Sequence, residues 1–405
     1  MNIGGARPSH LTYCTNIHPG ETWPEVRRNL ERHVLRVKAI VAPDRAFGVG
    51  LRLSAEAARS LGEPATLAEL KSFLSLNDLY VFTINGFPYG PFHGTRVKED
   101  VYRPDWLEEE RLHYTDALSW ILAALLPAGL LGSISTVPGC FKPRAAHQGS
   151  TAAMADRLLR HVSTLVGLER GTGKRIALAL EPEPYCVLET VAETVAFFES
   201  HLFGRSAIAK LASLSGLGAS AAEGALHRHL GVCFDSCHAA VEFEDPQAAV
   251  LALRGAGIAI HKIQVSAGLL VDPPSAENKV ALASFAEDVY LHQVVSRRGV
   301  ELRRYPDIAP ALADPAAAND DEWRIHFHVP LFREELGAFR NTQGFLRELL
   351  ALQTRDGLTS HLEVETYTWH VLPPEYRAAD VAEDVARELR WTLEALAVPP
   401  HPPSQ

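Results

Sequence analysis

The stretch LGVCFDSCH, residues 230–238, is an apolar run that ends at an acidic residue and is soon followed by a histidine. Consecutive uncharged residues of this kind are typical of a strand that is buried on both faces of a parallel sheet. Asp235 then stands at the carboxyl end of the strand, and His238 lies three residues further on. An aspartate in this place is often only a turn or cap residue, so the rest of the chain must decide whether the pair binds a metal.

Seven further β-type runs alternate with helical patterns along the chain. They span residues 11–15, 46–53, 79–84, 131–137, 176–181, 258–265 and 362–366. Eight β-α units with right-handed crossovers most simply close into a (β/α)₈ TIM barrel, which is the fold that we predict. A doubly wound open sheet is the alternative. It usually carries a glycine-rich loop after its first strand, and TNIHPGETW (15–23) is not such a loop.

The chain between residues 265 and 362 is far longer than one crossover requires. It contains a stretch rich in proline and alanine and an additional β-like run at 323–332. Because such a segment follows a strand end, we predict a lid-like insertion over residues 266–332, above the mouth of the barrel. The remainder is expected to form a single domain over residues 1–397, with a disordered tail at 398–405.

Composition narrows the classes of partner. The formal net charge of −10 argues against a nucleic-acid ligand, because binding to phosphates needs a basic surface. The five cysteines are scattered and show no CxxC pair, which favours reduced thiols in the cytoplasm. The start of the chain lacks an apolar leader, and Pro127 interrupts the apolar run at 117–135, so we expect a buried helix, a turn and a strand rather than membrane insertion. The oligomeric state is left open.

Polar side chains end the last four predicted strands, at the face of a TIM barrel where active sites lie. They are Glu181, Asp235, Gln264 and Glu365. Three carboxylates at one barrel mouth would repel each other and lose hydration unless a cation joined them. We therefore predict that these four residues bind a divalent metal ion (Mn²⁺, Mg²⁺, Co²⁺, Fe²⁺ or Zn²⁺), with an oxygen-rich, hard character.

Further polar residues surround this predicted centre. In HFHVP (326–330), strand alternation places His326 and His328 on one face, although such pairs are often only solvated. Glu183 lies between prolines and is interpreted as a loop carboxylate. Lys142 and Arg144 follow the fourth strand, where they are either contacts for a substrate carboxylate or phosphate or, as we prefer, solvated surface charges.

These motifs together resemble the xylose-isomerase-like TIM-barrel superfamily, which includes sugar phosphate isomerases and epimerases and an apurinic endonuclease type. LALEPEP (178–184) is similar to its metal-binding Glu strand, GVCFDSCH (231–238) to its D-x-x-H strand end, and LEVE (362–365) to its last Glu. In IHKIQVS (260–266), Gln264 stands where a ligand His is usual. HFHVPLFREELGAF (326–339) resembles a segment that supplies a second-metal pair, with His326 in place of Asp.

The resemblance also shows departures. The endonucleases place two more histidines after the third and fourth strands, where this chain has Asn85 and Val137. A trinuclear zinc site for DNA cleavage is therefore not expected. What the likeness implies is one site of Glu181, Asp235, Gln264 and Glu365. His238, His326, His328 and Asn85 are left for substrate or a second ion.

Three functions follow. The first is an isomerase or epimerase of a small polyhydroxylated carbonyl compound, in which the resemblance implies that the metal stabilises an enediolate while Glu181 and Glu365 transfer protons. The second is a metal-assisted hydrolase or lyase with a dinuclear site. The third is a binding protein with little turnover, because YCTNIHPGETW (13–23) and HLEVETYTWH (361–370) also resemble a family of bacterial metabolite traffic proteins. Proteins encoded beside it would then be its partners.

Overall fold

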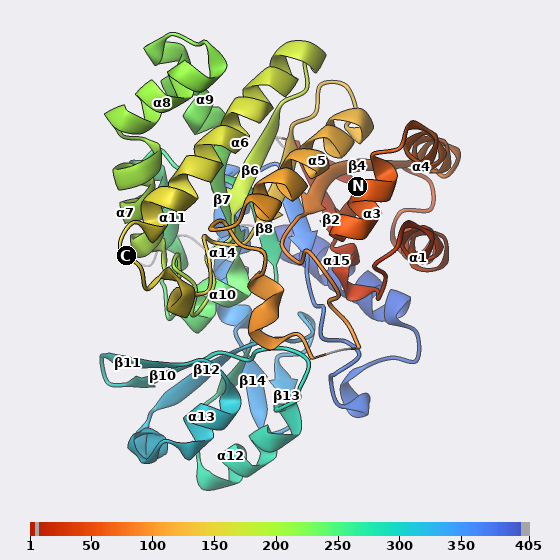
Figure 1. Cartoon of the computed structure of the whole chain (residues 1–405). Helices are drawn as coiled ribbons and strands as arrows, with labels where there is room; N and C mark the ends of the chain where they lie inside the picture. Colours follow the sequence, from red (N-terminus) through yellow and green to blue (C-terminus); the bar gives the residue numbers. More distant parts are fainter. Residues whose placement is uncertain (5–7, 95, 398–405) are drawn as a thin grey trace.

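The eight predicted strands form one circular series of parallel strands in the computed structural model, which describes residues 1–4, 8–94 and 96–397 (Figure 1). From β3 to β8 each strand pairs with the next in chain order, and β15 pairs with both β8 and β2. The strands are β2 (Ser9–Tyr13), β3 (Phe47–Arg52), β4 (Leu79–Asn85), β5 (Gly132–Thr136), β6 (Ile176–Leu180), β7 (Leu230–Asp235), β8 (Ala259–Val265) and β15 (His361–Val364). The predicted TIM barrel is confirmed. The tail at 398–405 lies outside the described residues.

The circle closes between β2 and β3 through sparse contacts. A single bridge joins Cys14 to Gly50. The Thr12 hydroxyl donates a hydrogen bond to the Gly48 carbonyl oxygen (2.7 Å) and accepts one from the Gly50 amide (3.0 Å). The short strand β1 (Asn2–Gly4) adds to β2 in antiparallel orientation. One bridge and the hydrogen bonds of a side chain therefore join β2 to β3, whereas all other neighbouring barrel strands are joined by backbone hydrogen-bond ladders.

Helices cover the outside of the barrel. A capping box of Thr22 and Glu25 begins the first of them, and the apolar residues Val26, Leu30, Val34 and Val37 that follow are buried. The apolar run at 117–135 divides into a helix that ends at Leu125, a turn and β5, as predicted. The helices are α1 (Trp23–Asn29), α2 (Leu35–Val41), α3 (Ala55–Leu61), α4 (Pro64–Leu76), α5 (Glu109–Leu125), α6 (Ser150–Thr172), α7 (Val191–Phe197), α8 (Arg205–Ser215), α9 (Ala219–His229), α10 (Ser236–Val241), α11 (Pro246–Gly255), α14 (Gln343–Asp356) and α15 (Val381–Ala397).

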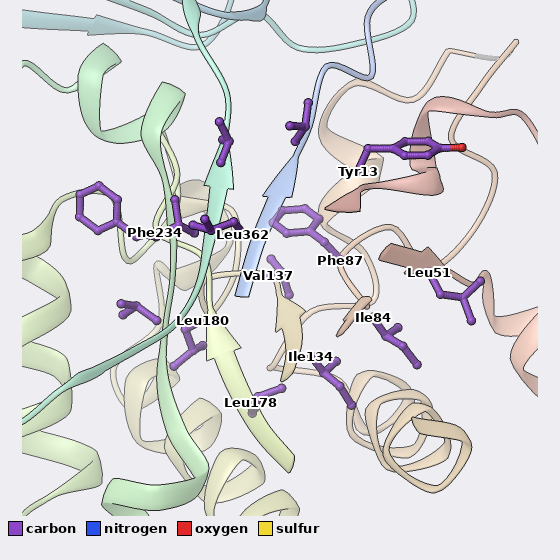
Figure 2. Packing of buried hydrophobic residues seen from close by; sticks show 14 of the residues in the cluster. Tyr13, Leu51, Ile84, Phe87, Ile134, Val137, Leu178, Leu180, Phe234 and Leu362 are labelled. Carbon is purple, nitrogen blue, oxygen red and sulfur yellow. The ribbon is translucent and has the colours of Figure 1, made fainter. Parts of the chain in front are cut away.

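Successive side chains of each barrel strand point alternately towards the surrounding helices and towards the interior of the barrel, so the two sides of the sheet are packed differently. Apolar side chains such as Leu51, Ile84, Ile134 and Leu178 belong to the large buried cluster, part of which is drawn in Figure 2. Inside the barrel, by contrast, Lys262 and Glu363 form a fully buried ion pair. Within residues 1–4, 8–94 and 96–397, no helix is long and apolar enough to cross a membrane.

The inserted segment forms its own antiparallel sheet, at the end of the barrel where the strands terminate (Figure 1). Its strands lie in the order β11-β10-β12-β9-β14-β13. The sheet reaches Asn341, nine residues beyond the segment expected from the sequence. Its elements are β9 (Gly268–Val271), α12 (Ala276–Leu282), β10 (Val294–Arg298), β11 (Glu301–Tyr305), α13 (Ile308–Ala313), β12 (Glu322–His328), β13 (Glu335–Leu336) and β14 (Phe339–Asn341).

Replacing Gly50 by alanine is expected to destabilise the closing seam. A Cβ at this position would overlap Glu363 Oε1 and lie 2.5 Å from the Tyr13 carbonyl oxygen. Overpacking of this kind costs about 1–3 kcal/mol, measurable as a lower midpoint in urea unfolding. The control is Gly167→Ala in α6, where nothing lies within 4 Å and helix propensity predicts a gain of about 0.5–1 kcal/mol. Equal midpoints for G50A and the wild type would contradict this account of the seam.

Candidate metal centre and its pocket

Asp235 joins the sixth barrel strand to a short helix and leaves one oxygen free. Its Oδ1 accepts hydrogen bonds from the amides of Cys237 (2.7 Å) and His238 (3.2 Å) and from the Ser266 hydroxyl (2.6 Å). These bonds cap α10 and fix the carboxylate. Oδ2 is buried and has no hydrogen-bond partner. The cap interpretation and the ligand interpretation are therefore compatible, because each uses a different oxygen.

Three buried histidines are held in the same way, through Nδ1. His238 Nδ1 faces the Pro182 carbonyl oxygen (2.9 Å), and His326 Nδ1 faces Gln293 Oε1 (2.8 Å). His328 Nδ1 faces the Glu365 carbonyl oxygen at 2.6 Å. An oxygen acceptor requires a proton on each Nδ1, so each neutral ring presents a lone pair at Nε2. Burial lowers the pKa of all three imidazoles, which keeps them in this neutral form.

The free Nε2 atoms converge on one point. His238 Nε2 and His326 Nε2 are 3.0 Å apart, and ligand atoms of all three histidines lie within 4.8 Å of one another. The free Asp235 Oδ2 is 3.7 Å from His238 Nε2 and 3.9 Å from His328 Nε2. Facing lone pairs and a buried carboxylate oxygen repel one another unless a cation lies among them. The residues present thus fit a metal ion, with nitrogen donors that suit zinc and related ions.

Glu181 extends the cluster towards the pocket. It follows β6, and one of its oxygens lies within 4.8 Å of ligand atoms of Asp235 and His238. Its Oε2 is buried without a partner. A third close group consists of Asp235, Cys237 and His328, although burial raises the pKa of the Cys237 thiol and so favours its protonated form. Cys237, which the sequence interpretation left out of the site, therefore lies beside it.

Glu365 and Gln264, the other two predicted ligands, are placed differently. Glu365 Oε1 accepts hydrogen bonds from the amides of Asn16 (2.7 Å) and Asn85 (3.0 Å), and within the described part of the chain it belongs to none of the close groups. Gln264 is fully buried, and its Oε1 accepts a hydrogen bond from the Cys233 thiol at 3.1 Å. The structure thus gathers Glu181, Asp235 and the three histidines, and sets Glu365 beside Asn85.

A pocket adjoins the cluster. Five of the predicted site residues line it, namely Asn85, Glu181, His238, His326 and Glu365. The other lining residues come from the loops after the strands and from the inserted segment. They are Asn16, Phe87, Pro88, Phe92, Lys98, Val101, Tyr102, Glu183, Tyr290, Leu291 and Tyr367.

Glu183 lies in the loop after β6, as the sequence indicates, and it also contributes to the pocket. It is buried in the pocket wall, where the Tyr102 hydroxyl donates a hydrogen bond to Oε1 at 2.7 Å. His326 Nδ1 lies 3.5 Å from the same oxygen. Burial raises the pKa of Glu183 to about 8. The sequence contained a signal for this position, because Glu181 and Glu183 in LALEPEP both follow the same strand end and could therefore both reach the pocket.

The carboxyls of the pocket disfavour their charged forms. Burial raises the pKa of Glu181 well above its usual value, and the charges of Glu365 and Asp235 raise it further. Burial and the charge of Asp235 do the same for Glu365. A bound cation would reverse this preference, because it stabilises the carboxylates that it neighbours.

Lys142 and Arg144 do not line the pocket. Lys142 forms ion pairs with Glu189 and with Glu193 (3.2 Å), and Arg144 with Asp105 (2.7 Å). These contacts agree with the preferred interpretation that both are charges of the protein surface, with no role at the site.

No protein-family model matches the chain, and neither does any curated protein. Solved structures with a similar course of the backbone include a xylose isomerase-like TIM barrel protein from Mycobacterium smegmatis in complex with magnesium (13% identity, 98% of this chain and 100% of that one, TM-score 0.47). Another is the probable 3-DHS dehydratase AsbF from Bacillus anthracis (13%, 94% and 97%, 0.44). A third is the IOLI protein with a bound zinc atom (12%, 96% and 98%, 0.44). The fold assignment rests on the strand order described above.

Proposed function

We propose that this protein is a metal-dependent isomerase or epimerase of a small polyhydroxylated carbonyl compound. The observation that carries the proposal is that Glu181 and Glu365, which follow β6 and β15, line one pocket beside the metal-ligand cluster. Two barrel strands, β7 and β8, separate their positions in the sheet. Two carboxyls approaching a bound substrate from different strands suit the removal and return of a proton at carbon.

The residues that fit a divalent cation are Asp235, His238, His326 and His328, with Glu181 as a further ligand. When bound, such an ion supplies positive charge that stabilises negative charge developing on a carbonyl oxygen. The chain's own groups do the rest. Asn16 and Asn85 hold the Glu365 carboxyl through Oε1, and this leaves its Oε2 for proton transfer. The aromatic side chains of Phe92 and Tyr367 give the pocket an apolar surface.

Incubation of the metal-loaded protein with a panel of ketoses in D₂O tests this proposal. We expect deuterium to enter at carbon beside the carbonyl group, and Glu365→Gln to slow this exchange at least 100-fold because the amide cannot take up the proton. Metal content should stay unchanged in E365Q, since Glu365 lies outside the close ligand groups. The matched control is Glu110→Gln on the exposed face of α5, which should exchange at the wild-type rate. No exchange with any ketose, or full exchange by E365Q, would refute the proposal.

A second candidate is a hydrolase or lyase with a dinuclear site. It is favoured by the number of donors, because the histidine trio and the group of Glu181, Asp235 and His238 are enough to serve two ions. Native mass spectrometry of the protein as purified distinguishes the two candidates. One ion per chain supports the isomerase, whereas two zinc ions per chain support the hydrolase or lyase.

We further propose a cellular setting, on the narrower sequence likeness. YCTNIHPGETW (13–23), YLHQVV (290–295), WRIHFHVPLF (323–332) and HLEVETYTWH (361–370) resemble the metabolite traffic protein EboE, which is tied to a bacterial cluster for secondary-metabolite precursors. The protein would then act on such a precursor in the cytoplasm, in line with its five free buried cysteines. If E365Q restored metabolite production in a strain lacking the gene, a binding role without turnover would replace the enzymatic one.

A further inference from the structure

We infer that the pocket recognises an uncharged, unphosphorylated polyhydroxylated substrate. This inference rests on the proposed function and narrows its substrate class. It follows from the distribution of polar, aromatic and cationic groups around the pocket, and from the partners that already occupy the nearby cationic side chains.

One part of the pocket wall is built for hydroxyl groups. The amides of Asn16 and Asn85 and the carboxyls of Glu181, Glu183 and Glu365 line it. Each carboxyl either accepts hydrogen bonds from a hydroxyl or, when protonated, donates one. A phosphate dianion can only accept hydrogen bonds, so it matches these carboxyls only when they are protonated, whereas a hydroxyl group matches a carboxyl in either form.

Aromatic side chains form another part of the wall. Phe92, Tyr290 and Tyr367 pack as one cluster, with ring centroids 5.1–5.3 Å apart. Phe87 adds a fourth ring to the pocket lining. Ring faces of this kind suit the C–H faces of a sugar or cyclic polyol, because they offer apolar contact without competing for its hydroxyls.

The single cation among the described lining residues is already neutralised. Lys98 Nζ donates to the carbonyl oxygens of Glu287 (2.8 Å) and Tyr290 (2.6 Å) and to Asp307 Oδ2 (2.8 Å). An ammonium group has three N–H donors, and these three partners use all of them. Lys98 therefore fastens the inserted segment to the loop after β4 and has no donor left for an anion.

The nearest arginines are committed to the backbone beneath the pocket. Arg111 donates to the carbonyl oxygens of Gly86 (2.6 Å), Phe87 (3.0 Å) and Pro104 (2.7 Å). Arg52 donates to Gly90 O (2.5 Å) and pairs with Glu21 Oε1 (2.9 Å). Both side chains shape the loop that carries Phe87, and neither lines the pocket.

The N-terminus of α15, the helix after the last strand, is also occupied by protein carboxylates. The Ala382 amide donates to Asp380 Oδ1 at 3.0 Å. Asp380 pairs with Arg36 (2.6 Å), and Asp384 in the first turn of the helix pairs with Arg387 (3.4 Å). These carboxylates therefore already use the backbone amide and the arginine charges that an anion would need at this helix end.

Matched ligand pairs test the inference directly. Isothermal titration of the metal-loaded protein compares D-fructose, D-xylulose and D-ribulose with their terminal phosphate esters, and with inorganic phosphate alone. At least one neutral sugar should bind ten-fold or more tightly than its phosphate ester, and inorganic phosphate should not bind at millimolar concentration. Tighter binding of any phosphate ester, or no binding of any neutral sugar, would overturn the inference.

Two variants probe Lys98. Asp307→Asn removes the neutralising charge while keeping the oxygen that accepts the Ile308 amide (2.8 Å). D307N should improve binding of the phosphate esters at least five-fold and leave the neutral sugars unchanged. Lys98→Met should not alter the preference of the wild type; selective loss of phosphate-ester binding in K98M would show that Lys98 holds the phosphate. A preference for phosphate esters leaves the D₂O exchange result standing, whereas sugar binding without exchange refutes only the proposed isomerase.

Discussion

Zinc is expected to raise the thermal midpoint of the metal-free protein by several degrees, and His328→Ala is expected to remove most of this rise. His328 Nε2 is buried without a partner, while its Nδ1 is fixed by the Glu365 carbonyl oxygen. An ion that binds only the folded protein at 1,000 times its Kd stabilises it by about 4 kcal/mol. Removal of one of three imidazoles should weaken the affinity at least 100-fold, which at the same zinc concentration leaves no more than about 1.4 kcal/mol of the stabilisation. Thermal unfolding followed by circular dichroism, before and after dialysis against EDTA, measures both effects.

A buried histidine remote from the cluster provides the matched control. His229 on α9 has both ring nitrogens engaged, by the Ile176 carbonyl oxygen (2.7 Å) and by Glu169 Oε2 (3.0 Å). His229→Ala should lower the midpoint itself but keep the full increment on addition of zinc. If H328A kept that increment, or if the wild type responded to no divalent ion, the cluster would not be a metal centre.

The donor set also predicts which ion stabilises the protein. The sequence alone suggested a site of three carboxylates and one amide, which favours hard ions. The structure places three imidazole nitrogens and one free aspartate oxygen together. Imidazole suits zinc and cobalt better than magnesium. Micromolar zinc should therefore stabilise the protein more than millimolar magnesium does, and the reverse order would favour the oxygen-rich alternative.

The position of Asp235 was predictable from the sequence because every determinant is local. The apolar run, the acidic residue that ends it and the histidine three residues further on can all be read directly from LGVCFDSCH. Strand alternation likewise predicted that His326 and His328 share a face, and both enter the cluster even though β12 pairs irregularly with β9 between Ile325 and His328. The barrel could be predicted for the same reason, because each of its strands is a short buried run whose two ends are visible in the sequence.

The burial of a side chain and its contacts with distant segments could not be predicted from the sequence. Gln264 is in register with Asp235, but nothing in IHKIQVS tells that its Oε1 accepts a hydrogen bond from the Cys233 thiol (3.1 Å). Glu183 is buried because Tyr102 and the inserted segment cover it, and neither contact can be inferred from two flanking prolines. The carbonyl oxygens that fix the histidine tautomers come from Pro182 and Glu365, so the donor set emerges only when three distant segments meet.

Replacing Lys262 by methionine is expected to cost about 3–5 kcal/mol of unfolding free energy, because it leaves the Glu363 carboxylate buried without a countercharge. Burial alone would lower the pKa of the Lys262 ammonium, but the charge of Glu363 outweighs burial and raises it. Both side chains are fully buried inside the barrel, so water cannot replace the lost partner. Urea unfolding measures the loss. Lys71→Met, on the exposed face of α4, should change stability by less than about 0.5 kcal/mol.

The double variant Lys262→Met, Glu363→Leu distinguishes a role of the ion pair in stability alone from a role in positioning the strand that carries Glu365. If the pair only offsets its own desolvation, two apolar side chains should recover most of the stability lost by K262M. Glu363 Oε1 also lies against Gly50 at the sparsely bonded seam, two residues before Glu365 in the pocket. We therefore expect the double variant to unfold near the wild-type midpoint but to lose D₂O exchange, because the pair positions the strand that carries Glu365. Recovery of both properties would show that any filling of the barrel interior is sufficient.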